Sequence, residues 1–496
     1  SIGMDADNID PRHIRVYGNG GGQLPYLNAA TQYDDPEENA IYVAGETDGR
    51  FDGSDYVLFY GSSQTRWKYD SVTKQFQHAN NQYCDTTYYF LTTDLGAGKR
   101  ITQRNSSTVQ PQVNVTSFND YAFHETDQYN LLKSGREWYG ERMDNINTSR
   151  SFSFSFPNHS SSDTVFLRAS LLGRATNSTN HNSNSFTIKI NGATLTAQGF
   201  ADVGSSAQDN YAVPVTINKP IIGAGTSIEV TVFFSSTDPN AQGWINFLEL
   251  TTRCGLSISG RSSQFHFRDI NSAGIGTIAN YTISGANSNQ WLWDISTPNE
   301  IVQQQSTITG STLNFAAAAD IVREFILFTP TSTPEPIASG RISNQNLHGL
   351  SQADMFIVTH PNFLSQANQL AEFHRNRGLS VHVVTPREIY NEFSSAAQDV
   401  CAIRNMMKMF YDRSSSPSDM PRYLLLLGDA SYDNKYRITD NTNYIPSYQS
   451  AGSLNNTQTY MSDDFFGLLD DSEGEWTSGE IVDMAVGRLP VKSAAE

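Results

Sequence analysis

The chain has 496 residues, enough for about three domains of ordinary size. Its 51 acidic residues outnumber the 33 basic ones, and a net charge of −18 argues against the basic face of a nucleic-acid-binding protein. The three cysteines, Cys84, Cys254 and Cys401, are far apart and form no Cys-x-x-Cys pair, which argues against a zinc site or a disulfide scaffold.

Residues 1–117 predict an N-terminal β region, because β-branched and aromatic residues form short runs at 14–17, 41–43 and 56–60. The glycine-rich segment 18–23 carries Gln23 where a dinucleotide-binding loop needs its third glycine, so it predicts a turn. The acidic segment 48–55 resembles a calcium loop, but Arg50 occupies a ligand position. It therefore predicts a polar hairpin turn.

Residues 118–253 predict a β-sandwich of the jelly-roll type. Serine and phenylalanine alternate over residues 151–156, which places the aromatic rings on one face of a strand. Asn191 and Gly192 separate two alternating runs, the strongest short-range signal for a β-hairpin. Trp138 and Trp244 stand among apolar neighbours and are predicted to lie in the core; glycan binding by the sandwich is the alternative.

Residues 254–330 return to short strands, which we predict to pair with residues 1–117 around an inserted sandwich. Residues 331–345 form the predicted linker. Prolines at 330, 334 and 336 favour extended polyproline conformation around its start.

Residues 346–496 predict part of an α/β domain with a parallel sheet, since apolar runs at 355–358, 381–384 and 423–427 alternate with helical spacing. Ser395 and Gln398 fit a capping box for a helix whose apolar face is Val400, Ile403, Met407 and Phe410. Two of the strands lead into Gly428-Asp429 and Gly487-Arg488. Ligands bind at the carboxyl ends of parallel strands, where Asp429 and Arg488 are expected.

A search for a nucleophile gives no complete site. The sequence has no Gly-x-Ser-x-Gly elbow, which argues against an α/β-hydrolase. Cys401 follows Val400 on the predicted helix and is expected to be a buried, inert thiol. His382 lies in mid-strand among valines as a core residue, and His360 stands at a strand end without an identifiable partner.

Four aspartates are expected at the mouth of the sheet: Asp429, Asp433, Asp463 and Asp464. Carboxylates in such loops cap helix ends and accept loop hydrogen bonds, and calcium binding is the alternative role. We expect no required cofactor, and calcium is the candidate ion.

Several motifs in the α/β region carry a family resemblance. They are Leu-Gly-Asp429-Ala-Ser-Tyr-Asp433, Asn443-Tyr-Ile-Pro-Ser-Tyr448, Ser462-Asp463-Asp464-Phe-Phe-Gly467 and Val486-Gly487-Arg488-Leu-Pro490. In this order they resemble the gingipain family of cysteine peptidases. Segments 9–20, 48–52 and 238–244 extend the resemblance to the β-rich part and favour the sortase branch, which serves the type IX secretion system of Bacteroidetes.

The resemblance implies a caspase-like α/β domain in which a Cys-His dyad activates a thiolate against a peptide carbonyl. In the family the catalytic His and Cys follow later strands, so we expect both beyond Glu496. No catalytic residue is assigned to this chain, which is expected to be inactive alone. Asp429, Asp463 and Asp464 match family positions, which implies a supporting or calcium-binding role.

The implied function of the intact protein is that of a cysteine endopeptidase and transpeptidase. It would remove C-terminal sorting signals from exported cargo and attach the cargo to surface lipopolysaccharide. Implied partners are exported protein substrates, an outer-membrane secretion component and lipopolysaccharide, at the extracellular face of the outer membrane or in secreted form. The sequence opens at Ser1 without a signal peptide, so we expect a trimmed N-terminus. The alternatives are a secreted gingipain-like endopeptidase that only hydrolyses, and a non-enzymatic surface adhesin or scaffold.

Overall fold

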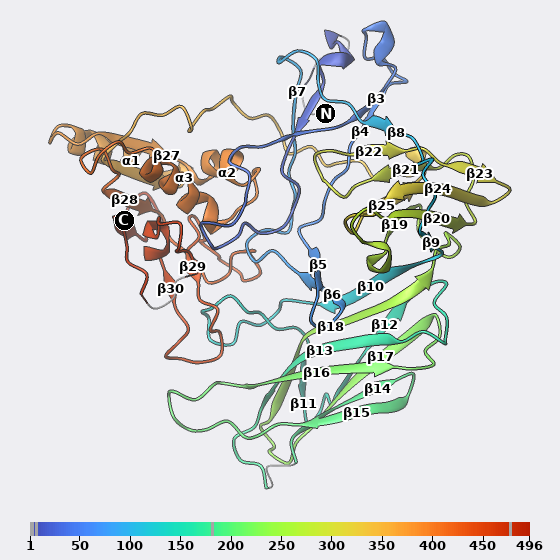
Figure 1. Ribbon diagram of the computed structural model, residues 1–496. Helices are drawn as coiled ribbons and strands as arrows, with labels where there is room; N and C mark the ends of the chain where they lie inside the picture. Colours follow the sequence, from blue (N-terminus) through green and yellow to red (C-terminus); the bar gives the residue numbers. More distant parts are fainter. Residues whose placement is uncertain (1–3, 5–7, 180–182, 476–478) are drawn as a thin grey trace.

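The computed structural model describes residues 4, 8–179, 183–475 and 479–496. Figure 1 shows an α/β domain, drawn orange and red, on one side of the molecule and a series of β-sheets along the other. The predicted class is therefore confirmed: a β-rich first part is followed by an α/β domain with a parallel sheet. No helix in the described ranges is both long enough and apolar enough to cross a membrane.

The β-sandwich consists of two antiparallel sheets in the orders β10-β18-β13-β16 and β12-β17-β14-β15, with β11 also paired to β18. Asn191 and Gly192 have φ of 48° and 84° and form the predicted tight turn between β14 and β15. The strands are β10 (Ser117–Glu125), β11 (Arg142–Asp144), β12 (Ser149–Ser155), β13 (Val165–Arg174), β14 (Ser185–Ile190), β15 (Ala193–Gly199), β16 (Val213–Ile221), β17 (Ser227–Ser235) and β18 (Gln242–Gly255).

Two further sheets lie next to the sandwich, in the orders β19-β25-β21-β22-β8 and β23-β24-β20-β9. Two strands that precede the sandwich in sequence belong to these sheets. β8 pairs in parallel with β22, and β9 with β20, so residues 102–115 supply an edge strand to each sheet. The strands are β8 (Thr102–Arg104), β9 (Val113–Val115), β19 (Gln264–Arg268), β20 (Ile278–Ser284), β21 (Trp291–Asp294), β22 (Val302–Gln304), β23 (Thr307–Thr309), β24 (Thr312–Ala318) and β25 (Glu324–Phe328).

The first hundred residues are distributed over several bodies. Their small sheets are β2-β1-β7, the hairpin β3-β4 and the hairpin β5-β6. The β5-β6 hairpin lies on the sandwich, where Trp67 stacks on Tyr121 with ring centroids 3.8 Å apart. The acidic segment 48–55 lies within the β3-β4 hairpin loop, as predicted. The strands are β1 (Arg15–Tyr17), β2 (Glu38–Asn39), β3 (Tyr42–Ala44), β4 (Tyr56–Leu58), β5 (Arg66–Asp70), β6 (Gln75–Ala79) and β7 (Phe90–Thr92).

The α/β domain is built on a parallel sheet in the order β27-β26-β28-β31. A small antiparallel pair, β29-β30, lies beside it. The elements are β26 (Met355–Thr359), α1 (Leu364–Arg375), β27 (Val381–Val384), α2 (Pro386–Phe393), α3 (Val400–Asp412), β28 (Tyr423–Leu427), β29 (Tyr448–Gln449), β30 (Met461–Ser462), the 3₁₀ helix η7 (Asp464–Gly467) and β31 (Ala485–Leu489).

The predicted capping box at Ser395 and Gln398 is wrong. Ser395 has a positive φ of 50° and follows the end of α2, while α3 is capped by the Asp399 side chain, which accepts the Cys401 N–H. The capping box of this region is formed by Thr385 and Glu388 at the start of α2. The apolar face predicted for α3 is confirmed, since all four of its named residues are buried.

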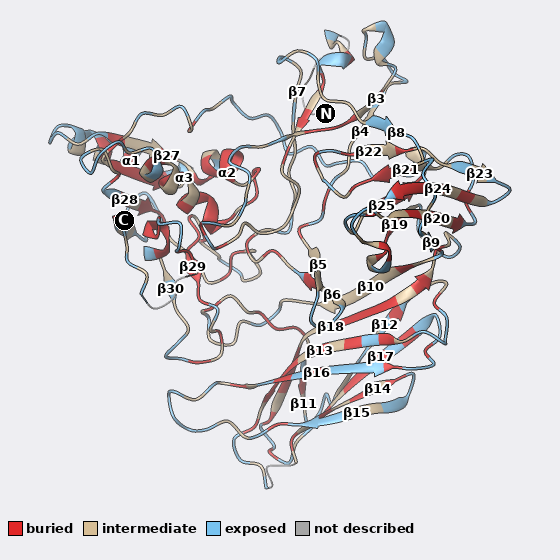
Figure 2. Cartoon of the chain, in the orientation of Figure 1, coloured by how far each residue is buried: buried red, intermediate tan, exposed pale blue. Residues whose placement is uncertain are grey.

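Figure 2 shows buried residues, drawn red, in the strands and helices of the α/β domain. Side chains at alternate positions of its parallel sheet pack into two separate cores. Phe356 and Val358 of β26 face α2 and α3, whereas Met355 and Ile357 face α1. A strand buried on both faces is what the continuous apolar runs predict. In the β part, one continuous core extends from the sandwich into the neighbouring sheets.

Candidate functional site

The carboxyl ends of the parallel strands are aligned at one edge of the α/β sheet. Thr359, Leu427 and Leu489 pair across β26, β28 and β31 at the ends of these strands. Gly428 follows β28 with φ of 151°, and a Cβ there would lie 3.2 Å from the Cβ of Tyr444. The chain therefore turns sharply at the edge where ligands of parallel α/β sheets bind.

Arg488 is the central side chain of this edge. Its Nε and Nη2 donate to the two oxygens of Asp463, each at 2.7 Å, and its Nη1 donates to the carbonyls of Gly428 and Ile445, each at 2.9 Å. A bidentate, largely buried guanidinium–carboxylate pair is strong and geometrically specific. Arg488 thus fixes three loops relative to the end of β31.

Asp429 and Asp433 organise the loop after β28. The Asp429 carboxylate accepts from the Thr442 hydroxyl and lies 3.4 Å from the Lys492 ammonium. Asp433 is fully buried, and its oxygens accept from the Ile438 N–H at 2.8 Å and from other groups of the same loop. Both carboxylates are therefore engaged in loop geometry.

Asp464 is exposed and is the first residue of η7, next to the Asp463 that pairs with Arg488. In the described part of the chain, two groups of residues could hold a metal ion by geometry, and neither includes Asp429, Asp463 or Asp464. Because Arg488 already neutralises Asp463, the contacts favour a supporting role. Calcium binding by the three aspartates stays a prediction.

His360 follows β26 at the same edge. Its ring stacks on Tyr444 with centroids 4.3 Å apart, its Nδ1 accepts the Asn362 N–H at 3.3 Å, and burial lowers its pKa. His382 is partly buried, and its Nε2 lies 2.8 Å from the Ser351 carbonyl oxygen. Its ring therefore has a hydrogen-bond partner within the fold, as expected.

The cysteines do not form a reactive site with these histidines. Cys401 is fully buried, and burial raises the pKa of its thiol well above the usual value. Burial also raises the pKa of Cys254 to about 12. Among the described residues, no cysteine sulfur is hydrogen-bonded to an imidazole: Cys84 and Cys401 contact the carbonyls of Thr86 and Leu24. The prediction of a buried Cys401 is confirmed, and its thiolate is disfavoured.

An N-terminal strap, residues 18–35, packs along α3 and was missed by sequence reasoning. The Leu24 N–H donates to Asp399 Oδ2 at 2.9 Å, and Asn405 Nδ2 donates to Gln32 at 3.0 Å. Asn28 binds the carbonyls of Leu468 and Asp470. In Figure 1 this dark blue segment crosses from the β part to the α/β domain. The strap thus joins the two parts of the molecule.

Arg404 anchors the strap from the middle of α3. Its side chain is fully buried, its Nη1 donates to the carbonyls of Tyr26 and Gly474, and its guanidinium lies 4.7 Å from the ring centre of Phe465. Tyr26 and Tyr83 belong to the same apolar core as α2 and α3. Segments from the first hundred residues therefore complete the interior of the α/β domain.

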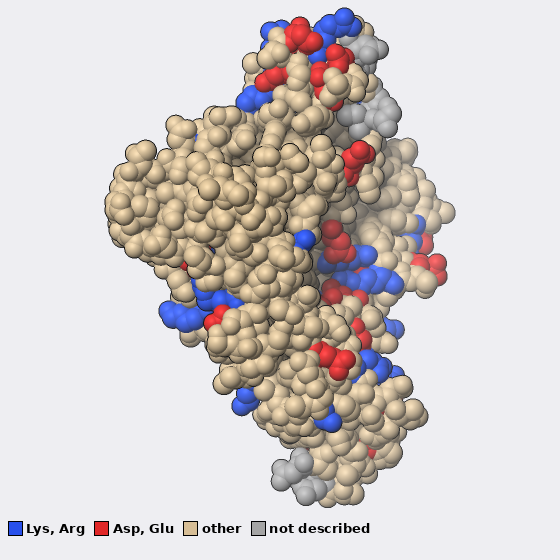
Figure 3. Space-filling view, turned by 90° about the vertical axis from the view of Figure 1, so that its right-hand side faces the viewer, with Lys and Arg blue, Asp and Glu red and all other residues tan. Residues whose placement is uncertain are grey.

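A polar cavity of about 220 Å³ lies where the sandwich meets the α/β domain. Its lining includes Glu125, Asp127 and Glu137, and Asp127 pairs with Arg437 at 2.6 Å. Burial raises the pKa of both Asp127 and Glu137. Figure 3 shows acidic and basic side chains together in the hollow of one face, which carries no extended basic patch.

Comparison with known proteins gives two informative matches. Residues 348–496 match peptidase family C25. The whole chain is similar to the crystal structure of dimeric latent PorU from Porphyromonas gingivalis, with 25% identity, a TM-score of 0.84 and coverage of 98% of this chain and 46% of that one. The chain thus spans under half the length of that PorU chain. Curated protein sequences give no match.

Two carbohydrate-binding modules also align with part of the chain. One is a CBM36 in complex with calcium and xylotriose, with 15% identity, 27% coverage of this chain and 99% of that one, and a TM-score of 0.17. The other is the C-terminal CBM6 of LamC from Zobellia galactanivorans, with 13% identity, the same coverage and the same TM-score. At this TM-score neither supports a functional inference.

Residues 348–496, with their parallel sheet and the Arg488–Asp463 pair at its carboxyl edge, are a gingipain-type domain of peptidase family C25. The structural similarity to PorU extends over the β-rich part as well, so the chain as a whole is a PorU-like protein.

Proposed function

We propose that this chain is the N-terminal part of a PorU-like cysteine peptidase that acts as a sortase. The intact protein cleaves C-terminal sorting signals from exported cargo and transfers the new carboxyl end to surface lipopolysaccharide. The observation that carries the proposal is the match to PorU across 98% of the chain, because it includes the β-rich part as well as the peptidase domain.

In this proposal the catalytic thiolate and imidazole come from residues beyond Glu496 and meet the substrate at the carboxyl edge of the sheet. The thiolate attacks the peptide carbonyl, and the imidazole protonates the departing amine, leaving a thioester. An amine on the lipopolysaccharide then displaces the thiolate; water in its place gives hydrolysis. Within this chain, Arg488 and Asp463 hold the loops that border this edge.

The proposed setting is the extracellular face of the outer membrane, with an outer-membrane secretion component as partner. The test is complementation of a sortase-deficient strain that has a type IX secretion system, using the full gene product. Mass spectrometry of cargo should find the sorting signal removed and lipopolysaccharide attached. Removal without attachment favours a hydrolysing endopeptidase, and intact cargo favours an adhesin or scaffold.

The 496-residue chain alone should show no thiol-dependent peptidase turnover, because the thiol of Cys401 is fully buried with a raised pKa. An acyloxymethyl-ketone probe should therefore leave Cys401 unlabelled. Turnover by this chain that Cys401→Ala abolishes would refute the assignment of the nucleophile to residues outside it.

A further inference from the structure

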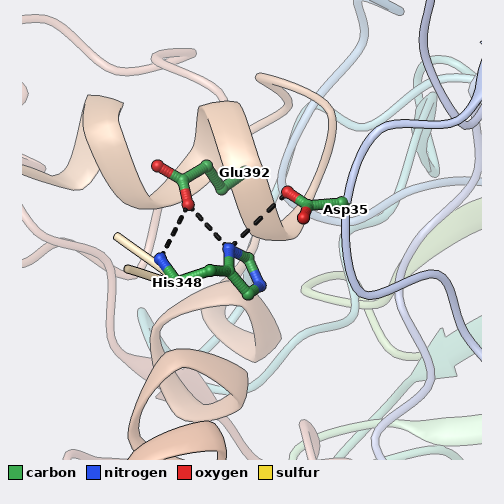
Figure 4. Close-up of side chains that lie close together, drawn as sticks. All are labelled: Asp35, His348 and Glu392. Carbon is green, nitrogen blue, oxygen red and sulfur yellow. Dashed lines mark hydrogen bonds and ion pairs between the residues drawn. The ribbon is translucent and has the colours of Figure 1, made fainter. Parts of the chain in front are cut away.

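Three residues from distant parts of the chain converge beside the last turn of α2. Asp35 belongs to the N-terminal strap, His348 follows the linker, and Glu392 lies on α2 (Figure 4). His348 Nδ1 lies 2.7 Å from Glu392 Oε2 and 3.6 Å from Asp35 Oδ1. Each residue offers one ligand atom, and these atoms lie within 4.8 Å of one another.

The acceptors around this imidazole exceed what its protons can satisfy. Nδ1 carries at most one hydrogen, yet two carboxylates face it. A third carboxylate, that of Asp34, lies 3.2 Å from Nε2. In the described ranges, every ion pair formed by Asp34, Asp35 and Glu392 is with His348. Even a doubly protonated His348 supplies one positive charge against three negative ones.

Two of the three ligands are held in place by the fold. Glu392 accepts the backbone N–H of Leu347 at 2.7 Å, the N–H of His348 at 3.2 Å and a side-chain N–H of Gln345 at 2.8 Å. The His348 ring stacks on Phe393 with centroids 4.5 Å apart and planes 17° from parallel. These contacts fix the ligand atoms before any cation arrives, which lowers the ordering cost of binding.

The position of Asp34 completes a pattern known from metal sites. A metal-ligating histidine usually donates its other ring N–H to a carboxylate, which fixes the tautomer and makes the ligand more basic. With a metal on Nδ1, the Nε2–H of His348 would donate to Asp34. Asp34 would thus act through His348 rather than as a ligand.

We propose that Asp35, His348 and Glu392 bind a divalent metal ion of the zinc class. One imidazole with two carboxylates is a nitrogen and oxygen set suited to zinc, and water completes the coordination on the exposed side of Asp35. Metal–ligand distances of about 2.0–2.2 Å require the 2.7 Å Nδ1–Oε2 contact to open slightly. The ion ties the strap to α2, a role separate from peptidase chemistry.

The second acidic group of the domain, Asp470, Glu473 and Asp483, is the natural control. It contains no imidazole. Like Glu392, its carboxylates accept backbone N–H groups, Asp483 from Leu469 at 2.9 Å and Glu473 from Asp470 at 3.1 Å, so the missing imidazole is the difference that the control isolates. A substitution there tests whether zinc binding depends on negative charge alone.

The experiment is isothermal titration of the 496-residue chain with zinc chloride, with cobalt(II) spectra as a second readout. One equivalent should bind, Asp35→Asn should weaken binding at least about tenfold, and Asp34→Asn should weaken it about tenfold. His348→Ala should abolish binding and Asp483→Asn should leave it unchanged. Asp35 is exposed, so its variant tests the site without disturbing the core.

The cobalt spectrum should lack a thiolate charge-transfer band, because the ligand set contains no sulfur. Zinc should also slow hydrogen exchange in the strap of the wild-type chain and have no such effect in Asp35→Asn. The proposal is overturned if the chain binds neither metal, if Asp35→Asn and His348→Ala bind as tightly as wild type, or if a thiolate band appears.

Discussion

Replacing Arg404 with methionine should weaken the attachment of the N-terminal strap to α3. The side chain has no exposed surface, and its guanidinium donates to the carbonyls of Tyr26, Gly474 and Pro25. Methionine keeps much of the volume but supplies no donor. The substitution therefore isolates the polar anchoring of the strap from its packing.

The expected loss is about 3 kcal/mol in the free energy of strap opening. Each carbonyl left buried without a donor costs about 1–3 kcal/mol, while removing a buried charge recovers part of its desolvation penalty. A loss of this size corresponds to roughly a hundredfold increase in the open population of the strap. The effect should be local, because the strap's contacts with Arg404 lie within the α/β domain.

Hydrogen exchange followed by mass spectrometry measures this opening directly in peptides from residues 18–35. The matched control is Arg422→Met, since the Arg422 side chain is half exposed and its pair with Asp354 at 2.6 Å is worth at most about 1 kcal/mol. Unchanged strap exchange in Arg404→Met would refute the anchoring role. So would equal acceleration in the sandwich, because that would indicate a global effect.

Three further outcomes follow from the same contacts. Arg488→Met should lower the free energy of unfolding of the α/β domain in urea by about 3 kcal/mol, because it leaves Asp463 unpaired. The stability of Arg488→Lys should fall between that of wild type and that of Arg488→Met, because lysine keeps the charge but cannot bond bidentately. Burial raises the pKa of Asp399 from 3.8 to about 6, so the folded state binds its proton more tightly. The stability of wild type relative to Asp399→Asn should therefore fall by about 2 kcal/mol as pH rises from about 4 to 6, and a flat difference would contradict the shift. Gly474→Ala should speed strap exchange, since a Cβ there would lie 1.9 Å from a strap carbonyl oxygen; Gly487→Ala, which meets open space, should not.

The elements that the sequence predicted well are those whose signal is local. The run Tyr423–Leu427 is apolar throughout and becomes a central strand of the parallel sheet. Asn191 and Gly192 required positive φ at both positions, and the structure has it. In both cases the residues that determine the local structure are adjacent to one another in the sequence, so a short window of sequence is enough to predict it.

The capping-box error at the start of α3 is of a different kind, because the signal for the true capping box was present in the sequence. Thr385, Pro386 and Glu388 give a capping box with proline at the first helical position, yet Ser395 and Gln398 satisfy the same sequence pattern about one short helix later. Ser395 and Ala396 have positive φ and lie between the end of α2 and the start of α3, so Ser395 cannot start a helix by a capping box. A capping pattern alone does not state which of two neighbouring helices it starts.

The strap had no local signal at all, and this limits how domains can be assigned from composition. Residues 18–35 have no periodic apolar pattern, and their partners in the α/β domain lie more than three hundred residues away, as in the contact of Leu24 with Asp399. The proline-rich linker marks a boundary in composition. Tyr26 and Tyr83, which precede it in sequence, nevertheless pack in the same core as α3, which follows it. The peptidase-type domain therefore depends for its interior on residues that precede the sandwich. The loops fixed by Arg488 at the carboxyl edge rest on a core that the β-rich part helps to build.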